Sequence, residues 1–216
     1  MSNQTDGVIK YQLDYTPVKA LPWARLREIN AWRELMYQLS LIGQDPTRYG
    51  GFGYGNISQR LAPLDAPPAH RAFVISGSQT GGLPHLTAEH YTTVHQCHPA
   101  ENRLVASGPL KPSSESLTHG AVYATSPHIS WVLHAHSPHI WRHAEALGLP
   151  ITHPSVPYGT PEMATEVARL FAETHVAEQG IFSMGGHEDG IVAFGSTGAE
   201  SFSVLVTCLG QAMALD

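Results

Sequence analysis

The segment from Trp131 to Pro138 constrains the fold of this chain more than any other. It reads Trp-Val-Leu-His-Ala-His-Ser-Pro, so an apolar run leads directly into a His-x-His pair formed by His134 and His136. If the run forms a β-strand, alternation places both imidazoles on one face of the sheet, where they can bind one divalent cation. A metal also needs a third ligand, and chemistry needs an acid, a base or an open coordination position. The pair therefore predicts a metal site that other segments complete.

Helix-like and strand-like patterns alternate along the chain. After an extended segment at 1–21, helices are expected at 22–42, 113–124, 138–147, 161–178 and 199–214. Strands are expected at 72–76, 91–95, 103–106, 131–136, 181–184 and 191–194, and a glycine-rich loop at 50–55 leads into a further strand at 56–58. Interleaved helices and strands predict an α/β fold in which helices cover a mixed sheet.

Composition narrows the class of protein. With 216 residues and no long polar linker, a single domain at 1–216 is expected. The net charge of −6 and only 12 Lys and Arg residues argue against nucleic acid or an anionic membrane as a partner. No run reaches the roughly 18 apolar residues that span a bilayer, and the polar start resembles no signal peptide, so a cytoplasmic protein is expected. Cys97 and Cys208 are expected to be free thiols.

Two further segments offer partners for the histidine pair. Glu115 stands at the start of an expected helix, where it can bind a metal, act as a general base, or simply complement the helix dipole. His187 lies in a Gly-Gly-His-Glu-Asp-Gly loop between two strand-like segments, and the flanking glycines allow the loop to approach a buried centre. It is the best third ligand by context, although a turn residue is the alternative and Glu188 and Asp189 are rival ligands.

Three segments place small hydrogen-bond donors beside glycine. They are 55–58, 76–81 and the Ser113-Ser114 pair. Hydroxyls, side-chain amides and exposed backbone N–H groups suit a phosphate or another oxyanion, particularly at a helix start. No Walker-type loop is present, so a nucleoside triphosphate is not indicated. Taken singly, each segment is more often just a turn, and the sequence alone does not show that they converge.

In their order and spacing, these segments resemble the class II aldolase/adducin family. The resemblance rests on Gly-Asn-Ile-Ser at 55–58, Ser-Ser-Glu at 113–115, His-Ala-His-Ser at 134–137 and the later Gly-His loop, and it covers about residues 23–211. It implies a three-layer α/β/α domain with a central mixed, largely antiparallel sheet. It also implies zinc or another divalent transition metal as cofactor and a homotetramer with active sites near subunit interfaces.

The resemblance also assigns roles to individual residues. It implies metal ligation by His134, His136 and His187 and proton transfer by Glu115. It further implies a phosphate site, whose residues would be Asn56, Ser76, Gly77, Ser113 and Ser114, with Thr80 and Gly81 as substitutes in the second segment. The implied substrate is a small sugar phosphate. Cleavage of its carbon–carbon bond leaves an enediolate, whose charge calls for an electrophile such as zinc.

Two departures from the family pattern bear on the reaction. The stretch 147–158 is shorter than its counterpart, which in the sugar-phosphate aldolases carries a proton-donating tyrosine from a neighbouring subunit. Tyr158 and His153 are the candidate replacements. The third-ligand loop also reads Gly-His-Glu-Asp-Gly where Asn-His-Gly is common.

Three hypotheses follow from the resemblance. The first is a metal-dependent aldolase that acts on a phosphorylated hydroxy-ketone. The second is a dehydratase or epimerase that uses the same metal and carboxylate. The third is a non-catalytic, adducin-like assembly module, against which the retention of three histidines and the acid argues.

Overall fold

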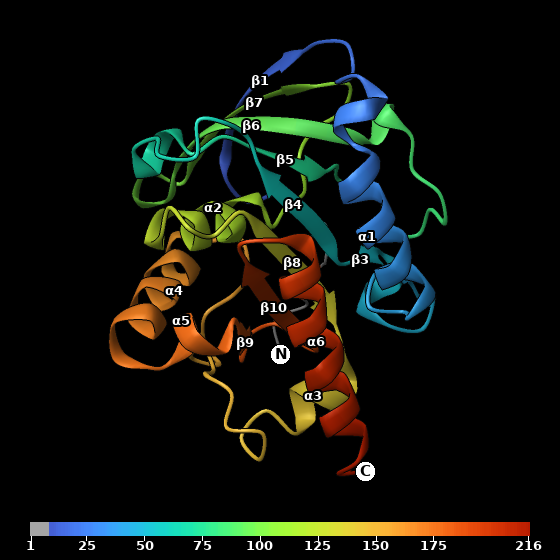
Figure 1. Ribbon diagram of the computed structural model, residues 1–216, viewed down its shortest axis with the longest axis vertical. Helices are drawn as coiled ribbons and strands as arrows, with labels where there is room; N and C mark the ends of the chain where they lie inside the picture. Colours follow the sequence, from blue (N-terminus) through green and yellow to red (C-terminus); the bar gives the residue numbers. More distant parts are fainter. Residues whose placement is uncertain (1–8) are drawn as a thin grey trace.

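A large, mostly antiparallel sheet forms the centre of the computed structural model, which describes residues 9–216 (Figure 1). Within this range, eight strands lie in the order β1-β7-β6-β5-β4-β8-β10-β9. Their bounds are β1 Gln12–Pro17, β4 Asn56–Arg60, β5 Phe73–Ser76, β6 Tyr91–His98, β7 Arg103–Gly108, β8 Trp131–His136, β9 Ile181–Ser183 and β10 Gly190–Gly195. Only the β1–β7 pair is parallel; the others are antiparallel. The mixed, largely antiparallel sheet expected from the sequence is confirmed.

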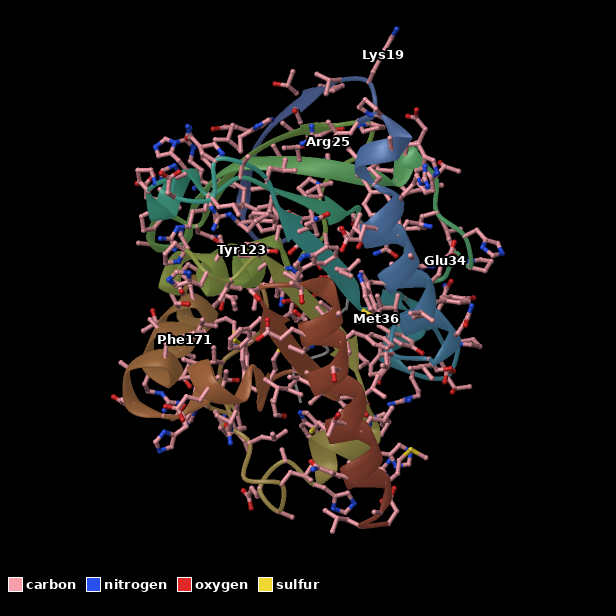
Figure 2. The ribbon with its side chains drawn as sticks, viewed as in Figure 1. Lys19, Arg25, Glu34, Met36, Tyr123 and Phe171 are labelled. Carbon is pink, nitrogen blue, oxygen red and sulfur yellow. The ribbon has the colours of Figure 1, made fainter. Side chains whose placement is uncertain are left out.

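Helices cover both faces of this sheet, which gives three layers (Figure 1). One face carries α2 Ser116–Thr125, α4 Pro161–Glu173 and α5 Val176–Gln179, and the other carries α1 Arg27–Gln38, α3 Pro138–Arg142 and α6 Gly198–Met213. Met36 lies on the inner side of α1 and Glu34 on its outer side (Figure 2). Helix α1 thus buries one stripe against the sheet, as an amphipathic helix of a layered fold does, whereas α2 is buried on nearly all sides.

Short elements connect these layers. A separate two-stranded sheet pairs β2 Gly43–Gln44 with β3 Gly53–Tyr54. The 3-10 helices are η1 Trp23–Arg25, η2 Tyr49–Gly51, η3 Pro68–His70, η4 Ala88–His90 and η5 Pro99–Glu101. In the described residues, no helix is long and apolar enough to cross a membrane.

Strand β8 sets the position of the histidine pair. It lies between β4 and β10, and every residue in it is buried. Leu133 and Ala135 join the apolar cluster beneath α1 and α6, whereas Val132 joins the cluster beneath α2. Because side chains alternate along a strand, His134 and His136 share the face of Val132. The predicted one-sided histidine pair is therefore confirmed.

Several element bounds differ from those expected. The segment predicted as a helix at 22–42 begins as η1, and α1 ends at Gln38 because Ser40 adopts φ +57°. The helix expected at 161–178 is divided in two by Thr174, whose extended backbone ends α4. Helix α3 ends at Arg142 and continues as turns up to Gly148, where φ is +65°. In each case apolar periodicity persists beyond the last helical residue.

The remaining differences concern the N-terminal half. Strand β6 extends three residues beyond its expected end, and its pairing with β7 shifts register between Val94 and Gln96. The segment expected to be merely extended at 1–21 includes β1, whereas residues 1–8 lie outside the described range. Cys97 and Cys208 are both buried and form no disulfide, as expected.

Candidate functional site

Three histidines converge at one end of the sheet. His134 and His136 project from β8, and His187 comes from the loop between β9 and β10. Antiparallel pairing places Gly190 opposite His136, which brings this loop back beside β8. Each of the three offers a ring nitrogen, and these nitrogens lie within 4.8 Å of one another. We call His134, His136 and His187 the histidine triad.

The triad fits a divalent metal ion. Burial lowers the pKa of His134 to about 3, and burial together with neighbouring imidazoles holds the pKa values of His136 and His187 well below the ordinary value. Neutral imidazole is the form that binds metals. Within residues 9–216, Nε2 of His134 and Nδ1 of His136 are buried without a hydrogen-bond partner, which is a costly state unless a ligand is bound nearby.

Neighbouring side chains fix the orientation of the imidazoles. The side-chain amide of Asn56 hydrogen-bonds Nδ1 of His134 at 3.2 Å and so leaves Nε2 available. The rings of Tyr49 and Tyr54 pack against His136, with centroids 4.4 and 5.2 Å away. The ring of Tyr158 packs against His187 at 4.7 Å. Each triad member is therefore held by a contact outside the triad.

Glu115 completes the group of polar side chains. Its Oε1 lies 3.9 Å from Nε2 of His187, and both side chains are buried. Glu115 immediately precedes α2 and is not part of its first turn. Its backbone N–H donates a hydrogen bond to Oγ of Ser113, in the turn that leads into the helix. A carboxylate at this position faces the positive end of the helix dipole. It is close enough to the triad to exchange a proton with a molecule bound there.

The two rival ligands in the loop of His187, Glu188 and Asp189, do not belong to the group of side chains that could hold a metal ion. Glu188 is exposed. Asp189 forms an ion pair with Arg48 and accepts a hydrogen bond from the hydroxyl of Tyr49 at 2.6 Å. The second contact ties the loop to Tyr49, which packs on His136. Asp189 thus supports the position of the triad from outside it.

A polar cavity adjoins the triad and Glu115. Its wall includes three segments that the sequence singled out as possible anion sites, and it is lined by Gly53, Tyr54, Gly55, Asn56, Gly77, Ser78, Gln79, Thr80, Gly81, Ser113, Ser114, Glu115, His134 and His136. We call Asn56, Gly77–Gly81, Ser113 and Ser114 the cradle. The cradle supplies amide, hydroxyl and backbone N–H donors. It contains no lysine or arginine.

One residue expected in the phosphate site lies outside the cavity wall. Ser76 is buried, and its Oγ accepts a hydrogen bond from the backbone N–H of Ile57 at 3.3 Å. Alternation along β5 places Ser76 on the face of Val74, beneath α1, and not on the face that the histidines share with Val132. Thr80 and Gly81, the substitutes considered for this segment, do line the cavity.

Backbone conformation brings the first cradle segment into place. Gly55 adopts φ +73°, and a Cβ there would lie 2.7 Å from Cγ1 of Ile42 and 2.9 Å from the carbonyl oxygen of Leu41. Only glycine tolerates both this angle and this contact. The turn then delivers Asn56 to the position opposite His134 in the β4–β8 ladder.

Sequence reasoning missed some contributors to the site. Tyr54 lines the cavity, and Arg48 and Tyr49 hold Asp189. The only sequence signal that could have found them was the glycine-rich composition of the loop around them. Of the two candidate replacements for the family tyrosine, Tyr158 lies against His187, whereas His153 is exposed and bonds Ser155.

Comparison with solved structures agrees with the fold. An L-fuculose-1-phosphate aldolase from Thermus thermophilus has a TM-score of 0.61 at 19% identity, with 89% of this chain and 91% of that chain covered. A sugar-phosphate aldolase from Thermotoga maritima has a TM-score of 0.62 at 17% identity, with 89% and 93% covered. At such identities the likeness establishes the fold alone.

Comparison with curated proteins gives a relative of higher identity. A methylthioribulose-1-phosphate dehydratase from Gluconacetobacter diazotrophicus is 35% identical over 108 residues. The match covers 49% of this chain and 46% of the relative, so the chain matches about half of that protein's length.

The family comparison covers most of the chain, including every member of the triad, Glu115 and the cradle. The model of the Class II Aldolase and Adducin N-terminal domain matches residues 47–212. This range also contains all strands of the large sheet except β1. The chain therefore belongs to the class II aldolase/adducin family.

Proposed function

We propose that this protein is a zinc-dependent lyase that acts on a small phosphorylated hydroxy-ketone. The observation that carries the proposal is the convergence of the histidine triad, Glu115 and the cradle on one cavity. A metal ligand set, a proton-transfer group and an anion site are what such a reaction requires.

The triad, the cradle and Glu115 have separate roles in this proposal. The triad holds the metal, which when bound supplies a Lewis acid for the substrate carbonyl group. The cradle binds the phosphate group and so fixes the reacting carbons beside Glu115, which removes much of the entropic cost of their alignment. Glu115 moves the proton through its carboxylate oxygens.

Aldol cleavage is the first candidate reaction. Glu115 accepts the proton of the hydroxyl group on the carbon whose bond breaks. The O–H electron pair forms the carbonyl of the departing aldehyde, and the carbon–carbon electron pair passes to the ketone fragment. Glu115 then returns the proton to that fragment, so that two carbonyl products leave and the enzyme is regenerated.

Dehydration is the second candidate reaction, and the dehydratase relative at 35% identity favours it. Here Glu115 takes a proton from the carbon beside the carbonyl group, and the C–H electron pair forms a double bond to the next carbon. The C–O bond on that carbon breaks, and its hydroxyl group leaves as water with the proton from Glu115. Both reactions use the same carboxylate and the same anchored phosphate, and they differ only in which bond breaks.

A non-catalytic assembly module is the contrasting class of protein. Such a module gains nothing from three buried imidazoles and a buried carboxylate, whose desolvation costs stability. Their joint retention beside a donor-lined cavity favours an enzyme.

A substrate screen tests the proposal. Zinc-loaded protein is incubated with a panel of ketose phosphates and with their unphosphorylated counterparts, and cleavage, water loss and epimerisation are measured separately. We expect cleavage or water loss with a phosphorylated ketose and at least about tenfold lower kcat/KM without the phosphate. Turnover of none of the panel, or turnover indifferent to the phosphate, contradicts the proposal.

The proposal includes a homotetramer, as the family resemblance implies. Light scattering of the purified protein measures the mass directly. A monomeric mass would contradict this part of the proposal and leave the chemistry of the single-chain site to be tested by the screen.

A further inference from the structure

Behind the cradle lies a buried arginine that never touches the cavity. Arg33 projects from α1 and is only 1% exposed. Its guanidinium donates to the carbonyl oxygens of Thr80 and Gly81, both at 3.0 Å, and of Pro84 at 3.1 Å. Within residues 9–216, no carboxylate forms an ion pair with it. Its guanidinium carbon also lies 4.9 Å from the centroid of the Tyr37 ring. A buried cation whose hydrogen bonds all go to carbonyl groups is unusual, because burial of charge normally calls for a countercharge.

The hydrogen bonds of Arg33 fix the direction of two peptide groups. A trans peptide is planar, so its N–H points opposite to its C=O. With the carbonyls of Thr80 and Gly81 turned toward Arg33, the N–H groups of Gly81 and Gly82 point away from it. Both nitrogen atoms lie 3.2 Å from the position that a Cβ on Gly53 would take, and Gly53 lines the cavity. Arg33 therefore turns both N–H groups toward Gly53, and Gly81 itself lines the cavity, whereas Gly82 lies just outside the lining.

Backbone acceptors among the described residues do not use these two N–H groups. Within residues 9–216, neither the N–H of Gly81 nor that of Gly82 donates to another backbone group. On its other side the loop packs closely against β3. A Cβ on Gly81 would lie only 2.8 Å from the backbone N and O of Tyr54. Glycine at this position lets the loop pack between Arg33 and β3.

The positive charge of Arg33 favours a bound anion, as the oriented N–H groups do. The described residues that line the cavity include no lysine or arginine, and Glu115 is their one carboxylate. Arg33 stands one peptide layer behind the wall, where solvent screens its charge little. Its guanidinium can therefore act on an anion bound in the cradle without contacting it.

We propose that Arg33 is a positioning residue for the phosphate group of the substrate, acting through the Thr80 and Gly81 peptide groups that it orients and through its buried charge. The inference rests on the proposed function, because it assumes that the cradle binds phosphate. It assigns part of the phosphate affinity to a residue outside the cavity.

Arg71 offers a matched control. It likewise donates to backbone carbonyls, those of Ala66 and Ala124 at 3.1 Å and that of Tyr123. Tyr123 and Ala124 belong to the C-terminal end of α2, whereas Glu115 precedes the N-terminal end. Loss of Arg71 therefore removes a comparable set of hydrogen bonds far from the cradle.

The test compares Arg33→Lys, Arg33→Met and Arg71→Met in metal-loaded protein. Calorimetry measures the binding of orthophosphate, kinetics measure kcat and KM for the phosphorylated substrate and its unphosphorylated analogue, and thermal unfolding monitors the fold. We expect both Arg33 variants to weaken orthophosphate binding and raise KM for the phosphorylated substrate by roughly tenfold or more, with kcat within about twofold. Lysine, which keeps the charge, should have the smaller effect. The unphosphorylated analogue should be unaffected, and Arg71→Met should lower only the unfolding temperature.

A measurement on the wild-type protein needs no substitution. On titration with orthophosphate, the amide signals of Gly81 and Gly82 should shift in nitrogen–proton correlation spectra. Unmoved amides, or Arg33 variants that bind orthophosphate within about twofold of the wild type, overturn the inference while the proposed function stands. Wild-type protein that binds no orthophosphate overturns both.

Discussion

The histidine triad and the cradle border the same cavity but are built in different ways. The triad consists of side chains fixed on or beside the buried strand β8, and its chemistry resides in the imidazoles. The cradle consists largely of loop residues, whose donors include backbone N–H groups and short side chains. The first region depends on which residues are present, and the second depends on how the backbone is held.

This difference has a consequence for mutation. Removing one imidazole takes away a metal ligand that no neighbour can replace. A cradle side chain, by contrast, is only one of several hydrogen-bond donors to the same anion. Substitutions in the triad should therefore act on metal content and on kcat, and substitutions in the cradle should act on KM.

The largest effect is expected for His136→Ala. Loss of one of three ligands should remove the metal and lower kcat/KM at least about a thousandfold. Orthophosphate binding should stay within about threefold of the wild type if the two regions are separable. His139→Ala is the control, because His139 lies on α3 and bonds Asp216 instead. If the variant loses orthophosphate binding as well as the metal, the triad and the cradle are not separable.

Glu115→Gln tests the group between the two regions. The amide keeps the size of the side chain but cannot accept the proton, so kcat should fall roughly a hundredfold to ten-thousandfold. Metal content measured by atomic spectroscopy should not change. Exposed Glu188, in the loop of His187, gives the control variant Glu188→Gln. If Glu115→Gln empties the metal site, Glu115 is a ligand and not only a proton carrier.

Asn56→Ala should affect both regions, since Asn56 lines the cavity and bonds Nδ1 of His134. Loss of such an orienting contact typically lowers metal affinity about tenfold to a hundredfold. Competition with a metal-binding dye measures this affinity, and orthophosphate calorimetry measures the effect on the cradle. An effect on phosphate alone would show that the contact with His134 does not orient the ligand.

Ser114→Ala should have the smallest effect of the four. Loss of one donor to a charged phosphate should raise KM for the phosphorylated substrate about tenfold. Neither kcat nor metal content should change, and Ser155→Ala, at an exposed position, serves as the control. A fall in kcat at unchanged KM would assign Ser114 to the chemical step.

The same contrast explains what the sequence could predict. The triad was accessible because β-strand alternation and a glycine-flanked loop are local patterns around His134, His136 and His187. Glu115 was expected just inside a helix start, a place that left several roles open, and the family resemblance implied its role in proton transfer. Ser76 was expected in the phosphate site, but its side chain lies on the opposite face of the sheet from the triad and accepts a hydrogen bond from Ile57 of β4.

Long-range packing accounts for most of what could not be predicted. The parallel pairing of β1 with β7 joins residues about 90 positions apart, and no local pattern specifies it. Arg33 reads in the sequence as an ordinary polar residue of a helix. Its role depends on carbonyl groups of residues 80–84, which only the tertiary fold brings beside α1.

The most direct test of the central claim is anomalous diffraction at the zinc edge from crystals of zinc-loaded protein. We expect one strong peak per chain, about 2.0–2.1 Å from one nitrogen each of His134, His136 and His187. A peak elsewhere with the triad empty, or no peak despite saturating zinc, would contradict it.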